Sequence, residues 1–253
     1  MPTPKNWSPP PCDPHHPPWV LQVAQLGKDF FLHAQGKAVA AAHDIAFTVH
    51  PGELVALVGP SGAGKSSLLK CIYRSYLPSS GRIHYRSAPG DVVDLATADD
   101  RDITALRARE IGFVSQFLHC LPRQGSADVV ARPLVALGTP RPEAQRRARA
   151  LLTRLGIHRG LHDIAPATFS GGERQRVNIA RGLVVQRRLV LLDEPTASLD
   201  AATQARVVTL LEEQKALGVA LVAVFHDPGL VERLADRVVP VALPVAAATA
   251  EAS

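Results

Sequence analysis

Hydrophobic residues in this chain occur in short continuous runs that are separated by longer segments of helical periodicity. Residues 54–58, 189–192 and 220–225 are apolar at almost every position, which is typical of strands buried on both faces of a parallel sheet. Two further β-rich runs, residues 19–24 and 44–49, precede them. Strands that alternate with helices predict an α/β fold with a mainly parallel sheet.

The segments between these runs repeat their apolar residues at helical intervals. Helices are predicted over residues 65–76, 141–155, 172–184 and 201–217. The interval from about Leu118 to Ser170 contains no clear strand. It is interpreted as an inserted helical subdomain over approximately residues 118–172.

The two ends of the chain differ in composition from this core. Residues 1–18 are rich in proline and residues 244–253 are rich in alanine, so flexible extensions are predicted on both sides of a domain over residues 19–243. Cys12, His15 and His16 lie in the proline-rich extension, where nothing fixes a ligand geometry, and a metal site is not expected there. Neither a secretory signal nor an apolar window of ~18 residues is found, so no membrane insertion is expected.

Composition and charge are those of an ordinary globular protein. Hydrophobic residues make up 46% of the 253 residues and charged residues 20%. Three cysteines without metal-ligand spacing favour a reducing, cytoplasmic environment. The net charge is +5, but the densest arginine group, at positions 141–154, has helical spacing beside leucines. It predicts a solvated helix face, and no nucleic-acid partner is expected.

A glycine-rich loop follows the first buried run. It fits the phosphate-loop pattern at every constrained position, with Gly59, Pro60, Ser61, Gly62, Ala63, Gly64, Lys65 and Ser66. Its main-chain N–H groups can surround phosphate oxygens, and the helix that starts near Lys65 directs its positive end at them. Lys65 is expected to contact the β- and γ-phosphates of ATP, Ser66 to ligate Mg²⁺, and Ser67 to complete the binding segment.

A pair of carboxylates ends the second buried run. Asp193 and Glu194 follow the apolar residues 189–192, at the sheet edge where ligands of open α/β sheets bind. Asp193 is predicted to hold Mg²⁺, directly or through water, and Glu194 to act as general base toward the attacking water. An apolar run before Asp-Glu is a weak motif alone, and the phosphate loop makes it specific.

A third motif narrows the family. Phe169, Ser170, Gly171, Gly172 and Glu173 resemble the signature motif of ATP-binding-cassette (ABC) proteins, with Phe and Glu where Leu and Gln are commoner. Ser170 and the two glycines can cap a helix whose N-terminus receives a γ-phosphate. The resemblance implies an ABC-type P-loop fold with an antiparallel N-terminal β subdomain.

Other residues resemble further motifs of the same family and occur in the same order along the chain. Gln116 is similar to the glutamine that contacts Mg²⁺ and senses the nucleotide, and Asp200 lies in a match to the loop that connects the two sites of a dimer. His226 is similar to the switch histidine at the γ-phosphate. Phe30 resembles the aromatic that stacks on adenine, with Phe31 as a competing candidate.

The resemblance covers about residues 20–239 and implies a mechanism. ATP is expected to lie between two cassettes, so the predicted partner is a second copy or a paralogous cassette. The chain is therefore expected to be an ATP hydrolase, with Glu194, His226 and Lys65 as its catalytic residues.

A finer resemblance involves residues 114–118, 121–123, 127–130, 168–173, 176–182 and 225–227. These stretches resemble the L-subunit family of the phosphonate carbon–phosphorus lyase system, whereas exporter-type cassettes usually differ at Phe169 and Phe225. The likeness implies a cassette that works with the lyase core subunits in forming ribose 1-phosphonate 5-triphosphate.

Two other classes remain open. The chain can be the nucleotide-binding subunit of an ABC transporter, since a fold does not fix a function. A non-catalytic binding module is disfavoured because Glu194 and His226 are both present.

Overall fold

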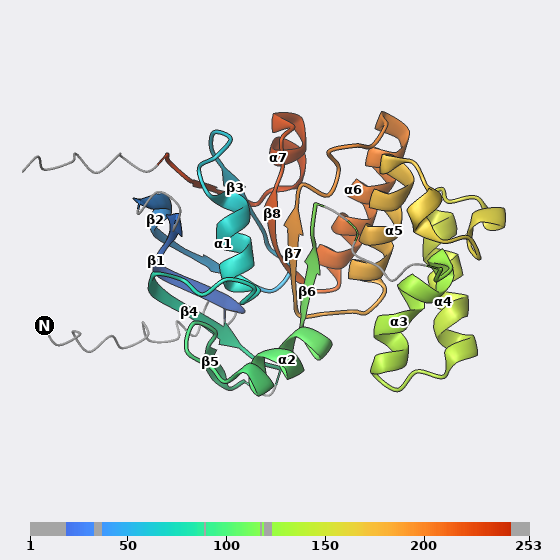
Figure 1. Ribbon diagram of the computed structural model, residues 1–253, viewed down its shortest axis with the longest axis horizontal. Helices are drawn as coiled ribbons and strands as arrows, with labels where there is room; N and C mark the ends of the chain where they lie inside the picture. The colour runs from blue at the N-terminus through green and yellow to red at the C-terminus, as the bar shows by residue number, and fades with distance from the viewer. Residues whose placement is uncertain (1–18, 33–36, 89, 117, 119–122, 244–253) are drawn as a thin grey trace, which may run out of the picture.

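The computed structural model describes residues 19–32, 37–88, 90–116, 118 and 123–243. The predictions for residues 1–18 and 244–253, including those for Cys12, His15 and His16, lie outside the described residues. So do parts of the stretches 114–118 and 121–123. Figure 1 shows one sheet at one end of the molecule, a second sheet in the middle and a group of helices at the other end.

One sheet is parallel and has the order β6-β7-β8-β3-β9. Its strands are β6 (Ile111–Val114), β7 (Leu189–Asp193), β8 (Ala220–Val224), β3 (Leu54–Val58) and β9 (Arg237–Pro240). Every residue of β7 and β8 is buried, as expected of strands covered on both faces. The three predicted buried strands are therefore β3, β7 and β8.

Alternate residues of these strands enter two different cores. Leu54 and Ala56 belong to one cluster of buried side chains, and Val55 and Leu57 belong to the other. Successive side chains of a strand point to opposite faces, so the parallel sheet separates the two clusters. One cluster includes α1 (Lys65–Ile72).

The second sheet is antiparallel and has the order β2-β1-β4-β5. Its strands are β1 (Leu21–Leu32), β2 (Lys37–Val49), β4 (Ser80–Arg86) and β5 (Val92–Asp94). The predicted strands 19–24 and 44–49 were too short. Pairing of β1 with β2 continues past three register irregularities, and such bulges break the alternation on which a sequence prediction depends.

The remaining helices are α2 (Asp100–Arg109), α3 (Ser126–Ala136), α4 (Arg141–Arg154), α5 (Gly171–Leu183), α6 (Ala201–Ala216) and α7 (Pro228–Leu234). In Figure 1, α3 and α4 lie at the end opposite the antiparallel sheet. The described residues 123–170 contain no strand. The limits 118–172 and 19–243 stay predictions. The predicted helix 65–76 was too long, because α1 ends at Ile72 and Arg74 has a φ of +67°.

Candidate nucleotide site

The loop between β3 and α1 leaves no room for a side chain at two of its glycines. At Gly59, a Cβ atom would lie 2.0 Å from the carbonyl oxygen of Val241. Gly64 has a φ of +85°, and a Cβ atom there would lie 2.2 Å from the carbonyl oxygen of Ala41. At Gly62, where φ is +81°, a Cβ atom would meet nothing within 4 Å. The loop is therefore packed tightly on one side and open on the other.

Lys65, the first residue of α1, turns back over this loop. Its ammonium group donates hydrogen bonds to the carbonyl oxygens of Gly59 and Pro60, each at 2.8 Å. The side chain of Ala63 is fully buried in the core. The lysine charge is thus held at the loop, where a phosphate group can reach it.

Ser66 and Asp193 bring two oxygen donors together beside the loop. The Ser66 hydroxyl donates to Oδ1 of Asp193 at 2.7 Å. Asp193 is 3% exposed, and burial is the main cause that raises its pKa, while the Ser66 hydrogen bond acts in the opposite direction. A hydroxyl beside a buried carboxylate is a ligand set that suits Mg²⁺, and a bound cation would offset the cost of burying the charge. The residues present therefore fit a magnesium ion.

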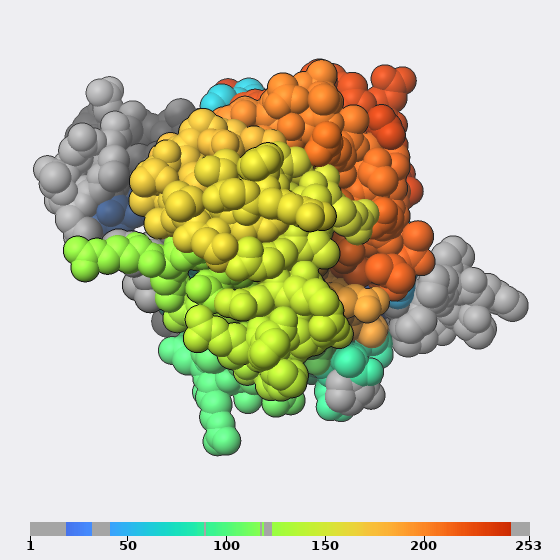
Figure 2. All heavy atoms as spheres, turned by 90° about the vertical axis from the view of Figure 1, so that its right-hand side faces the viewer, coloured from blue at the N-terminus to red at the C-terminus, as the bar shows by residue number. Residues whose placement is uncertain are grey.

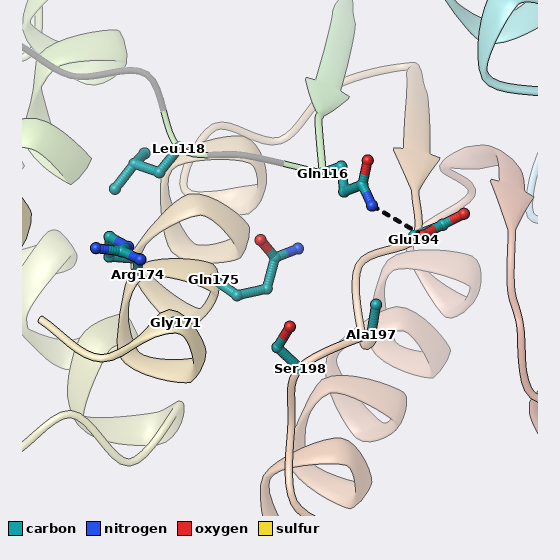
Figure 3. A pocket seen from close by; sticks show the side chains of 8 residues that line it. All are labelled: Gln116, Leu118, Gly171, Arg174, Gln175, Glu194, Ala197 and Ser198. Atoms are coloured by element: carbon teal, nitrogen blue, oxygen red, sulfur yellow. Dashed lines mark hydrogen bonds between the residues drawn. The ribbon is translucent and has the colours of Figure 1, made fainter.

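Side chains from two other loops contact the Glu194 carboxylate. Gln116, after β6, donates a hydrogen bond from Nε2 to Oε2 of Glu194 at 3.2 Å, and Nε2 of His226, after β8, lies 2.7 Å from Oε1 in an ion-pair contact. Figure 3 shows the bond between Gln116 and Glu194. Glu194 itself has a φ of +51°, which is uncommon for a residue other than glycine. Each of the two carboxylate oxygens is therefore in contact with a neighbouring side chain.

Half of the predicted site residues line one cavity of about 360 Å³. This size falls in the range of ligand pockets, about 300–1,000 Å³. Its walls are formed by Phe30, Ala41, Ser61, Gly62, Gly64, Lys65, Ser66, Ser67, Glu194 and His226. The cavity brings together Lys65, the hydroxyl-bearing Ser66 and Glu194.

Phe30, and not Phe31, lies at this cavity. The Phe30 ring packs edge-to-face on Tyr76 with 5.4 Å between ring centroids, and the ammonium group of Lys28 lies 4.9 Å from its centroid. The Phe31 side chain is 56% exposed and is not part of the cavity wall. Of the two aromatic candidates, Phe30 is therefore the one placed to contact a base.

The signature residues stand at the start of α5 and are not part of the phosphate-loop cavity. Ser170 and Glu173 form a capping box, in which the Glu173 N–H donates to the Ser170 hydroxyl and the Ser170 N–H donates to the Glu173 carboxylate. Hydrogen bonds from the side chain and backbone of Ser170 lower the pKa of Glu173. Gly171 lines a second cavity with Gln116 and Glu194 (Figure 3).

Seven predicted residues line neither cavity. Gly59, Pro60 and Ala63 belong to the phosphate loop itself, and Asp193 accepts a hydrogen bond from Ser66 beside it. The other three, Ser170, Gly172 and Asp200, lie in other segments of the chain. Asp200 instead caps α6, because its carboxylate accepts hydrogen bonds from the N–H and the hydroxyl of Thr203. Within one chain, the structure does not bring these three residues to the phosphate loop.

Two residues that sequence reasoning missed connect α5 to this site. Gln175 donates to the carbonyl oxygen of Pro195 at 3.1 Å, and Asn178 donates to that of Ser115 at 2.5 Å. Both are buried, and their acceptors are neighbours in sequence of Glu194 and Gln116. Amide side chains on the buried face of a helix were the available signal, since buried polar groups usually have a specific partner.

Comparison with known proteins identifies the family. Residues 42–197 match the sequence profile of the ABC transporter family. The chain belongs to the ABC transporter family. The ABC ATPase fold uses ATP with Mg²⁺, so the predicted cofactors are confirmed.

Curated relatives of this cassette include proteins of export and import systems. It is 40% identical to the lipoprotein-releasing system ATP-binding protein LolD of Pseudomonas fluorescens, over 87% of this chain and 93% of that protein. It is 37% identical to the methionine import ATP-binding protein MetN of Xanthomonas euvesicatoria, over 87% of this chain and 63% of that protein. It also matches the macrolide export protein MacB 2 of Aeromonas hydrophila, at 39% identity over 79% of this chain, but spans only 30% of that longer protein.

Solved structures confirm the predicted fold class. The ATP-binding cassette MJ0796 in a dimeric, post-hydrolysis state with ADP and Pi aligns with a TM-score of 0.80 and 26% identity, over 89% of this chain and 97% of that one. A second dimeric structure of MJ0796 gives the same TM-score of 0.80. Among the described residues of this cassette, no helix is long and apolar enough to cross a membrane.

Proposed function

We propose that this cassette is the nucleotide-binding ATPase of an ABC transporter, and that it acts on the cytoplasmic side of a membrane-embedded partner. The observation that carries the proposal is the likeness to a transporter ATP-binding protein along 93% of that protein's length, combined with the cavity that gathers Lys65, Ser66, Glu194 and His226. The import and export proteins named above support the same function.

In this proposal, each residue of the cavity has a distinct task. The phosphate loop and Lys65 bind the triphosphate. Ser66, Asp193 and Gln116 would hold Mg²⁺, which would stabilise negative charge on the phosphate oxygens. Glu194 accepts a proton from the attacking water. His226 contacts the γ-phosphate and orients the Glu194 carboxylate, with which it already forms an ion-pair contact.

A second cassette completes the site in this proposal. Ser170, Gly171 and Gly172 lie outside the phosphate-loop cavity of their own chain, so a partner's α5 would supply them to the triphosphate, and Asp200 would connect the two sites. The start of a helix is a favourable place for a phosphate group. The dimeric MJ0796 structures support such a pair, which can be a homodimer or a pair with a paralogous cassette.

The variant Glu194→Gln tests the catalytic part. It should bind MgATP with the parent's affinity, lower hydrolysis by about 10²–10⁴-fold and accumulate as an ATP-bound dimer. Single-turnover hydrolysis and size-exclusion chromatography measure both effects. Hydrolysis at the parent's rate would remove Glu194 as the base.

A role beside the carbon–phosphorus lyase core is the second candidate, as a subunit that supports formation of ribose 1-phosphonate 5-triphosphate. Phe169 before the signature serine and Phe225 before His226 favour it. Purification of the tagged chain with its native partners distinguishes the two functions. Membrane permeases in the purified material would support the transporter, and lyase core subunits would support the second candidate.

A further inference from the structure

The helical segment at residues 123–168 accounts for the net charge of the entire chain. It contains eight arginines and no lysine, against the three carboxylates Asp128, Glu143 and Asp163. This balance is +5, equal to the +5 of all 253 residues. The segment forms much of the surface that faces the viewer in Figure 2, in yellow-green and yellow. That face is therefore electropositive and attracts anions.

Most arginines of this segment already have a carboxylate partner. The ion pairs join Arg141 to Asp128, Arg146 and Arg147 to Glu143, Arg149 to Asp163, and Arg154 to Glu213. Within the part of the chain that the structure describes, Arg123, Arg132 and Arg159 form no ion pair. All three side chains are exposed, so their charges face solvent.

One of these three arginines, Arg159, lines a cavity of about 290 Å³ on the same face. The cavity wall consists of Arg149, Ala150, Thr153, Arg159 and His162. The Thr153 hydroxyl donates to the carbonyl oxygen of Arg149 at 2.9 Å, and Nε2 of His162 donates to that of Ile157 at 3.1 Å. The donors left for a ligand are therefore mainly those of the two guanidinium groups.

The donor count of these guanidinium groups favours an anion. Arg149 directs two N–H groups at the Asp163 carboxylate, and a guanidinium has five. Arg159 keeps all of its side-chain donors, and Asp163 balances only one of the two positive charges. Guanidinium groups bind phosphate oxygens through paired hydrogen bonds. The cavity lies at the lower end of the range for ligand pockets, about 300 Å³, so it suits one phosphate group better than a whole nucleotide.

We propose that this cavity is a second anion site, in which Arg149 and Arg159 bind a phosphate group. It shares no wall residue with the nucleotide cavity, and it does not depend on which partner the cassette has. The phosphate group can come from free inorganic phosphate or from the headgroup of an anionic phospholipid.

The test is a titration of the chain with inorganic phosphate, with the phosphate loop first saturated with MgADP so that it does not compete. The readout is the NMR signals of the His162 ring and the Gly160 amide, which report on the cavity and its neighbouring turn. Arg159→Ala should weaken phosphate binding by about tenfold or more. Arg132→Ala removes the same charge from the same segment outside the cavity and is the matched control, which should bind like the parent.

Sedimentation with vesicles identifies the source of the phosphate group. Binding to phosphatidylglycerol vesicles but not to phosphatidylcholine vesicles, lost in Arg159→Ala and kept in Arg132→Ala, assigns the site to a lipid headgroup. Phosphate binding without vesicle binding assigns it to the free ion. If neither probe binds saturably, or if both variants weaken binding equally, the charge is diffuse and the proposed site is wrong.

Discussion

Replacement of Gln175 by leucine tests how the loop next to Glu194 is held. The Gln175 side chain is 6% exposed and donates to the carbonyl oxygen of Pro195 at 3.1 Å. Pro195 is also buried. Leucine keeps much of the volume but has no donor, so the carbonyl loses its hydrogen bond where water has little access.

The expected loss of stability follows from this burial. Removing one partner of a buried hydrogen bond costs about 1–3 kcal/mol. In a chain of this size, a loss of about 2 kcal/mol lowers the melting temperature by roughly 4–8 °C. Turnover should fall as well, by up to about a hundredfold, because Pro195 directly follows the proposed base and small misplacements of catalytic groups are costly. Affinity for ATP should stay unchanged, since the phosphate loop is not touched.

Urea unfolding followed by circular dichroism, without nucleotide, measures the stability change. Gln204→Leu on α6 is the matched control, because the bond of Gln204 to Asp227 is exposed and 3.4 Å long. The control should change stability by less than about 0.5 kcal/mol. A Gln175→Leu chain that unfolds at the parent's urea concentration would refute the argument, since the Pro195 carbonyl would then not depend on this donor.

Three further predictions concern the phosphate loop and Asp193, the carboxylate predicted to bind Mg²⁺. Lys65→Ala should abolish tight ATP binding, measured by calorimetry, and unchanged affinity would contradict the site. Gly64→Ala should destabilise the chain more than Gly62→Ala in urea unfolding, because both have positive φ but only at Gly64 does the new Cβ meet a carbonyl oxygen, at 2.2 Å. Burial raises the pKa of Asp193 in the folded chain, so its contribution to stability falls as pH rises from the ordinary aspartate pKa through the raised one. Asp193→Asn should remove that decline and stabilise the nucleotide-free chain at neutral pH, and an unchanged pH profile of unfolding would exclude this role of burial.

Parts of the fold that repeat a simple pattern could be predicted from the sequence. The apolar strands β3, β7 and β8 agree with their predicted limits to within one residue, because a strand buried on both faces needs apolar residues throughout. The start of α6 at Ala201 was also predicted, and Asp200 caps it. Helix α3 was not predicted as a separate element. It contains Pro133, and proline in a helix interior normally argues against a helix.

Short or exposed strands escaped sequence reasoning for a different reason. In β4, Ile83 and Tyr85 are fully buried and alternate with polar residues, a period-two signal that could have been used. Strand β9 has no such signal, since Val238 is 52% exposed and its pairing with β3 alone makes it a strand. Pairing between distant segments is a tertiary property.

The sequence alone determined the phosphate loop and the carboxylate pair. The chemistry of each depends on residues that are consecutive in the chain, and these residues also set their own local conformation. Only the tertiary structure decided that Ser66 reaches Asp193, that Gln116 and His226 converge on Glu194, and that Phe30 rather than Phe31 faces the cavity. The contacts of Ser66, Gln116 and His226 join the ends of different strands of the parallel sheet, whereas Phe30 lies on β1 of the antiparallel sheet. Their distances depend on strand order and register. No local pattern encodes that order, because it follows from how the whole chain buries its apolar surface.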